Sequence, residues 1–142
     1  MKIEDLEFRA WDGKDMYYFN INEIDCGAIG VLDTSPKSDN NSYAKLIDLQ
    51  IMRYVGQVDV FKQKIYEGDI IKVNTILDIH PMCEQEIICE VVWNNKIATY
   101  DLNTIESDLY LKHWGFYDFE ESNPLRIIGN IYEKPNPLNY TR

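Results

Sequence analysis

The chain has 142 residues, and its 14 Lys and Arg against 24 Asp and Glu give a formal net charge of −10. Binding to a phosphate backbone requires clustered cations, so this charge argues against nonspecific nucleic-acid binding and favours a soluble acidic protein. With 45% hydrophobic and 13% aromatic residues, the chain has enough apolar surface for a core, which argues against a wholly disordered protein.

The first predicted elements are a hairpin and a loop. Phe8 and Ala10 alternate with Arg9 and Trp11, Asp12-Gly13 follows, and a second strand-forming run begins at Met16. Asp-Gly supplies the positive φ of a tight turn, so we expect a hairpin here. Residues 34–42 read TSPKSDNNS. Such side chains favour local bonds to the backbone, which predicts a mobile loop.

The next segment has the alternation of a half-buried strand. Between residues 45 and 54, Ile47, Leu49 and Ile51 alternate with polar residues. This spacing predicts a strand with those three side chains on its buried face.

Two further strands and a second hairpin follow. Residues 69–76 and 84–93 are rich in β-branched side chains and have the length of strands. Asn94-Asn95 comes next, before the run KIATYDL. Asn tolerates the left-handed backbone region, so we expect the hairpin turn at these two residues.

The C-terminal part predicts one short helix and a final strand. In residues 104–115, Ile105 and Leu109 share a helical face, acidic residues come early, and Gly115 could end the helix. The last strand, from residue 125, should stop before Pro135 and Pro137, because proline lacks the amide that a ladder needs.

These elements predict a mainly β or β-rich α+β fold with at most one or two short helices. With short connections and no alternating βα units, they suggest a small, partly open, SH3-like β-barrel extended by an N-terminal hairpin. We expect a single domain over residues 1–142, which is divided into an N-terminal hairpin region (1–33), a flexible loop (34–44), the barrel core (45–134) and an irregular tail (135–142).

Glu67-Gly68-Asp69 is predicted to be a structural turn that starts a strand. Gly68 can take a positive φ, and both carboxylates can accept hydrogen bonds from turn amides. The alternative is a metal or acid–base site. Such a site needs further ligands or a nucleophile at matching geometry, which a sequence cannot show.

Three segments together resemble one protein family. They are FRAWD (8–12), IMRYVGQVDVFKQKIYEGDIIKV (51–73) and IIGNIYEKP (127–135), in that order. The chain is similar to the YopX family of phage and prophage proteins. The resemblance implies a phage or prophage origin, a mostly β fold and no established activity, and it carries over no catalytic residues. Residues 58–64 lack the Asn-Gly turn common in that family, which leaves Phe61 as a candidate exposed residue.

No catalytic, cofactor-binding or metal-binding residues are predicted. His80, Cys83 and Cys89 could offer three zinc ligands and Cys26 a fourth, but the spacing is not that of a structural zinc site. Cys89 also lies in an apolar run, where a free cysteine behaves as a small hydrophobe. The glycines form no phosphate-binding loop.

The location expected is the cytoplasm of the host cell of a phage or prophage. The N-terminal sequence lacks a basic region followed by an apolar run, and no apolar stretch approaches about 18 residues, so we expect neither a signal peptide nor a membrane span. The odd number of irregularly spaced cysteines argues for free thiols in a reducing compartment.

The aromatic residues are the candidates for binding. Trp93, Trp114, Phe116, Tyr117 and Phe119 could form a platform for single-stranded nucleic acid, but a basic groove is missing from their surroundings. We therefore predict a protein contact, through Phe61, Trp114, Phe116 and Tyr117.

The sequence thus favours a non-enzymatic accessory protein that contacts protein, either a second copy of itself or a host factor. Two alternatives remain. One is a nucleic-acid-related accessory or DNA-mimic role, which the acidic charge would suit, and the other is a hydrolase with an unrecognised site.

Overall fold

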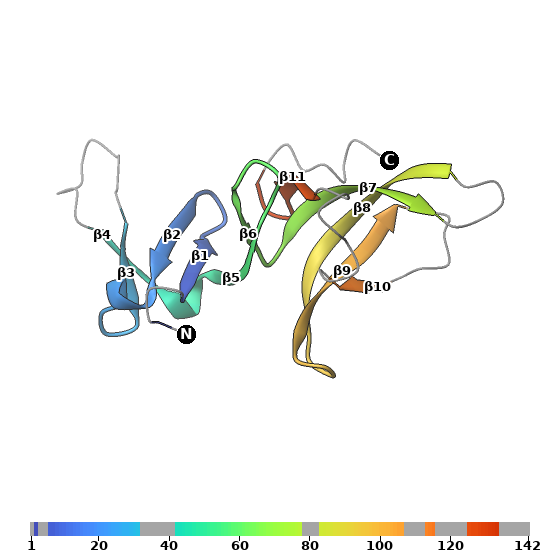
Figure 1. Cartoon of the computed structure of the whole chain (residues 1–142). Helices are drawn as coiled ribbons and strands as arrows, with labels where there is room; N and C mark the ends of the chain where they lie inside the picture. The colour runs from blue at the N-terminus through green and yellow to red at the C-terminus, as the bar shows by residue number, and fades with distance from the viewer. Residues whose placement is uncertain are drawn as a thin grey trace. The chain divides into compact units, whose positions relative to one another are not determined.

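The computed structural model describes residues 2, 6–31, 42–77, 83–106, 113–115 and 125–133. The chain divides into two compact units, Met1–Tyr54 and Val55–Arg142, and Figure 1 shows that both are built from strands. The helices in the described ranges are two 3-10 turns of three residues each, η2 (Ile21–Glu23) and η3 (Leu46–Asp48). Neither has the length or the apolar content to cross a membrane.

All paired strands that the structure describes are antiparallel, and they form three open sheets. The strands are β1 (Glu7–Trp11), β2 (Met16–Asn20), β3 (Ala28–Val31), β4 (Ser42–Lys45), β5 (Gln50–Val58), β6 (Lys64–Tyr66), β7 (Asp69–Leu77), β8 (Cys83–Asn94), β9 (Thr99–Glu106), β10 (His113–Gly115) and β11 (Leu125–Asn130). The prediction of a mainly β fold is confirmed. The described strands do not close into a barrel.

The predicted N-terminal hairpin is confirmed as β1 and β2, with Trp11 opposite Met16. Its turn includes Gly13 at a φ of 100°. One carboxylate oxygen of Asp12 accepts hydrogen bonds from the amides of Lys14 and Asp15, at 2.7 and 2.6 Å. The hydrogen bond from Asp15 is the main reason that the pKa of Asp12 is lowered. Asp12 therefore fixes the turn with its side chain.

The first unit has its own apolar core. Ala10, Phe19, Ile29 and Leu49 are buried together, and the rings of Phe8 and Phe19 stack with centroids 5.7 Å apart. These residues come from β1, β2, β3 and the segment before β5, so the small β3–β4 sheet contributes to the same core as the hairpin.

The strand predicted over residues 45–54 is wrong in its first half. Leu46–Asp48 is a 3-10 turn, and β5 begins only at Gln50. Of the three side chains predicted to be buried, Leu49 is buried, whereas Ile47 is 90% exposed and Ile51 39% exposed. The turn breaks the period of two, so the residues on its two sides no longer share a face.

The second unit contains a five-stranded sheet in the order β10-β9-β8-β7-β11. Its core is built by cross-strand pairs on one face, such as Ile71 opposite Cys89 and Val73 opposite Ile87. β6 pairs with β5, and Ile65 of β6 is fully buried in the same core. The two strands predicted over residues 69–76 and 84–93 are confirmed as β7 and β8.

Three local predictions need correction. The helix over residues 104–115 is wrong at both ends, because Thr104–Glu106 belongs to β9 and His113–Gly115 is β10; residues 107–112 lie outside the described ranges. In the β8–β9 hairpin, the positive φ is at Ala98 and not at Asn94-Asn95. Of the expected flexible loop 34–44, residues 42–44 are strand β4, and the rest is not described.

Candidate functional site

The loop between β5 and β6 presents Phe61, one of the predicted contact residues. Asp59 begins this loop and is 4% exposed. One oxygen of its carboxylate accepts hydrogen bonds from the amides of Phe61 and Gln63, both at 2.9 Å. The other oxygen accepts from the amide of Ile127 in β11 at 3.3 Å. Asp59 therefore fixes the loop and also ties it to a distant strand.

Every backbone amide from Asp59 to Gln63 is hydrogen-bonded within the chain. In addition to the two amides on the Asp59 carboxylate, the Asp59 amide donates to the Gln63 carbonyl at 2.8 Å and the Lys62 amide to the Asp59 carbonyl at 3.0 Å. The Val60 amide donates to the Leu125 carbonyl at 2.9 Å. The loop backbone is thus held in one conformation without help from a partner.

Apolar side chains are exposed on this loop and on Val58, the last residue of β5. Val58 is 40% exposed, Val60 50% and Phe61 64%. A cluster of exposed apolar side chains on a surface loop is a common mark of an interaction site, because burying it against a partner is favourable. We call Val58, Val60, Phe61, Lys62 and Arg126 the Phe61 surface.

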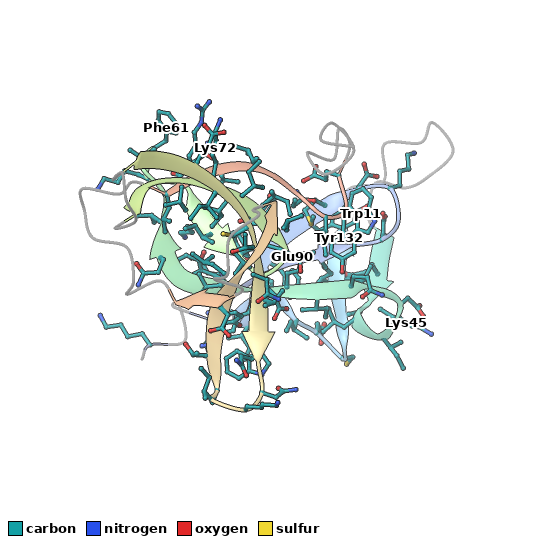
Figure 2. The ribbon with its side chains drawn as sticks, turned by 90° about the vertical axis from the view of Figure 1, so that its right-hand side faces the viewer. Trp11, Lys45, Phe61, Lys72, Glu90 and Tyr132 are labelled. Atoms are coloured by element: carbon teal, nitrogen blue, oxygen red, sulfur yellow. The ribbon has the colours of Figure 1, made fainter. Side chains whose placement is uncertain are left out.

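One cation of the Phe61 surface is in contact with its aromatic ring. The Arg126 guanidinium lies over the Phe61 ring, 5.7 Å from its centroid, and this cation–π contact holds the two side chains together. Lys72 is directly opposite Arg126 across β7 and β11, and Figure 2 labels Phe61 and Lys72. Lys72 forms an ion pair with Glu86, at 2.7 Å.

Glu67-Gly68-Asp69 is a turn whose backbone bonds to two other segments of the chain. Gly68 has a φ of 85°, and one carboxylate oxygen of Asp69 accepts from the Tyr66 amide at 2.8 Å. Gly68 donates its amide to the Val91 carbonyl at 2.9 Å and accepts from the Ile131 amide at 3.0 Å. The turn therefore connects β8 to the segment after β11.

The two carboxylates of this turn have different surroundings. Asp69 is 1% exposed and its partner is a backbone amide, whereas Glu67 is half-buried and its burial raises its pKa. A metal site or an acid–base site at this turn would need a third side chain besides Glu67 and Asp69. In the ranges that the structure describes, no three His, Cys, Asp or Glu side chains are arranged to hold a metal ion.

The structure does not bring together Phe61 and Trp114, the two predicted contact residues that it describes. Phe61 lies beside β11, whereas Trp114 belongs to β10, where it is opposite Leu102. β10 and β11 are the two opposite edges of the five-stranded sheet. Phe116 and Tyr117, with Phe119, lie outside the described residues. Trp93 packs edge-on against Tyr100, with ring centroids 5.0 Å apart.

The candidate zinc ligands are only partly described. Cys89 is buried, and this burial raises the pKa of its thiol to about 11. Cys26 is exposed and belongs to the first unit, in a turn between Asp25 and Ala28. His80 lies outside the described residues.

Sequence reasoning missed Asp59 and Arg126. For Asp59 a signal was present, because Asp at the start of a short polar loop favours bonds to amides a few residues ahead. For Arg126 there was none, since its contact with Phe61 spans 65 positions of the chain and depends on how β11 pairs with β7.

The segments that resemble the YopX family contain the Asp59 loop, the Gly68 turn and two residues that donate hydrogen bonds to them. Residues 51–73 contain the Asp59 loop and the Gly68 turn, and residues 127–135 contain Ile127 and Ile131, which donate to them. In sequence, no curated protein matches the chain. The family model described as YopX protein matches residues 7–139. The chain belongs to the YopX family.

Proposed function

We propose that this protein is a non-enzymatic binding module that contacts another protein through the Phe61 surface. The observation that carries the proposal is the combination of a 64% exposed Phe61 with a loop whose five consecutive amides are all bonded within the chain. A loop that is already ordered loses little conformational entropy on binding, so more of the contact energy becomes affinity.

The composition of the surface also suits a protein partner. Aromatic and Arg side chains supply most of the binding energy in protein interfaces, and they act best near the centre of a contact area. Phe61 and Arg126 are such a pair, and their cation–π contact favours an arrangement in which the two side chains lie together. Val58 and Val60 extend the apolar area around them.

Three buried carboxylates in the second unit accept hydrogen bonds from the chain itself, and this favours binding over catalysis as the function. Asp59 and Asp69 accept hydrogen bonds from backbone amides, and Asp101 accepts from the Asn94 side chain at 2.7 Å. Each holds a loop or a hairpin end in place. A carboxylate occupied in this way is poorly suited to act as a general base.

The wider setting is part of the proposal. We propose that the protein acts in the cytoplasm of a cell that carries a phage or prophage, and that its partner is a host factor or a phage protein. The small, partly open, SH3-like barrel predicted for residues 45–134 stays a prediction.

The test uses two substitutions of equally exposed side chains in the second unit. Phe61 and Ile97 are both 64% exposed, and Ile97 lies in the β8–β9 turn. Tagged wild-type, Phe61→Ser and Ile97→Ser proteins are produced in the host, crosslinked and purified, and the captured proteins are quantified by mass spectrometry. Thermal melts establish that both variants fold.

We expect a partner captured by wild type and by Ile97→Ser to be lost, by tenfold or more, with Phe61→Ser, since a hot-spot residue contributes about 2 kcal/mol or more. Equal capture by all three proteins would refute the Phe61 surface as the contact. Loss only with Ile97→Ser would move the contact to the β8–β9 turn.

A further inference from the structure

We infer that the partner of the Phe61 surface is an acidic segment of another protein, in which carboxylates flank an apolar residue. The inference rests on the proposed function and specifies its partner. Its basis is the local charge of the surface, which is opposite in sign to the net charge of −10 of the chain.

Two cations of the Phe61 surface are available to a partner. Lys62 and Arg126 are both exposed, and within the described residues neither is in an ion pair. Lys62 follows Phe61 directly and Arg126 lies over the Phe61 ring, so both flank the same aromatic side chain. A guanidinium in a cation–π contact keeps N–H groups at its edge that can bind a carboxylate with two parallel hydrogen bonds.

Among the residues that the structure describes, the neighbouring charges do not cancel this pair. Lys72 is balanced by Glu86, and the Asp59 carboxylate is 4% exposed and faces three amides of the chain. A partner that approaches Phe61 therefore meets Lys62 and Arg126 at contact distance. Charges further away are weakened by salt, because the screening length is about 8 Å at physiological ionic strength.

Nucleic acid fits this surface less well than an acidic protein segment. Lys62 and Arg126 alone cannot follow a phosphate backbone, and the net charge of −10 of the chain opposes its binding. Val58 and Val60 have no role in stacking bases, whereas they can pack against an apolar side chain. A second copy of the chain is also disfavoured, since two molecules of net charge −10 repel each other.

The test uses synthetic probes on the full chain. The acidic probe is a short fluorescent peptide in which Glu residues flank a central Leu-Trp pair. Its counterpart has Lys at every Glu position, and the third probe is a fluorescent oligo-deoxythymidine. Affinities come from fluorescence anisotropy at moderate salt, and the binding site comes from amide shifts in ¹H–¹⁵N spectra.

Two double variants supply the matched comparison. Lys62→Glu with Arg126→Glu reverses the charge of the Phe61 surface. Lys45→Glu with Lys96→Glu changes the net charge equally, at exposed positions, one in the first unit and the other in the β8–β9 turn; Figure 2 labels Lys45.

We expect the acidic peptide to bind and to shift the amides of residues 59–63 and 125–127. Lys62→Glu with Arg126→Glu should weaken the binding of the acidic peptide by about tenfold or more and favour the Lys peptide. The control double variant should change the affinity for the acidic peptide by less than about threefold.

Preference for the Lys peptide by the wild-type protein, or binding of no peptide, would overturn the inference. Binding of the oligonucleotide at these amides would assign the surface to nucleic acid. A dimer by light scattering that the Lys62→Glu, Arg126→Glu variant dissociates would identify a second copy as the occupant.

These outcomes are distinct from failure of the proposed function. That failure would appear as unchanged capture of partners by Phe61→Ser in the host, whatever the peptides do. If Phe61→Ser loses its partner while the acidic peptide does not bind, the Phe61 surface contacts protein but the acidic character of the partner is refuted.

Discussion

The Asp59 carboxylate accepts a hydrogen bond from the Ile127 amide, although 68 positions of sequence separate the two residues. The same carboxylate orders the loop that presents Phe61. One side chain thus joins the candidate binding surface to the edge strand of the five-stranded sheet, and the stability of the second unit and the shape of the surface depend on the same hydrogen bonds.

Asp59→Ala should destabilise the second unit by about 2 to 4 kcal/mol. The substitution leaves the amides of Phe61, Gln63 and Ile127 without their acceptor, and an unsatisfied group in a mostly buried setting costs about 1 to 3 kcal/mol. Urea unfolding measures the loss. Asp59→Asn keeps one oxygen acceptor and should cost less than Ala. If Asp59→Ala costs under about 0.5 kcal/mol, the carboxylate does not order the loop.

Gly68→Val should cost about 1 to 3 kcal/mol, because a β-branched residue is strained at a φ of 85°. Gly30→Val is the matched control. Gly30 does not have a positive φ, and a Cβ there would meet no atom within 4 Å. Thermal and urea unfolding should separate the two variants clearly. Equal melting temperatures would show that positive φ at Gly68 contributes nothing to stability.

Cys26 and Cys89 should differ sharply in reactivity. Cys26 is exposed, whereas Cys89 is buried with a thiol pKa raised to about 11 by burial. The reactive species is the thiolate, so at pH 8 Cys89 should stay unmodified in the folded protein while Cys26 is alkylated. Peptide mapping after a timed iodoacetamide pulse measures both. In urea the two should react at similar rates, and rapid modification of native Cys89 would contradict its burial.

Glu67→Gln should raise the melting temperature at pH 7 and leave it almost unchanged near pH 4. Burial raises the folded-state pKa of Glu67. The stability that a raised carboxyl pKa provides is present below the unfolded pKa and is lost as the pH rises through the folded pKa. Neutral Gln avoids that loss. A lower melting temperature for the variant at pH 7 would mean that hydrogen bonds to Glu67 outweigh the cost of burying its charge.

Local patterns predicted much of the fold. The Asp12-Gly13 hairpin and the strand at Asp69–Leu77 could be read because their signals lie within a few residues of each other. The strand predicted from Lys45 is wrong in its first half because a 3-10 turn at Leu46–Asp48 interrupts the alternation. The helix predicted around Ile105 is wrong because the helical pattern is short and this segment instead pairs with β8 as a strand.

The candidate site was predictable only in part. Phe61 could be named because its loop lacks the family's usual Asn-Gly turn. Its grouping with Arg126 could not, since a cation–π contact across two strands depends on the register of β11 against β7. Trp114 shows the opposite case, because its aromatic character suggested the same patch and the sheet order places it at the other edge.

The contact between Asp59 and Ile127 also determines when the Phe61 surface can form during synthesis of the chain. During translation the loop is made first, and its anchor follows 68 residues later, a delay on the order of several seconds at about 5 to 20 residues per second. Until β11 emerges and pairs with β7, Arg126 cannot lie over Phe61 and Val60 has no acceptor at Leu125. A nascent or truncated chain that lacks β11 would therefore not display the surface, so only a chain with a complete second unit could engage a partner there.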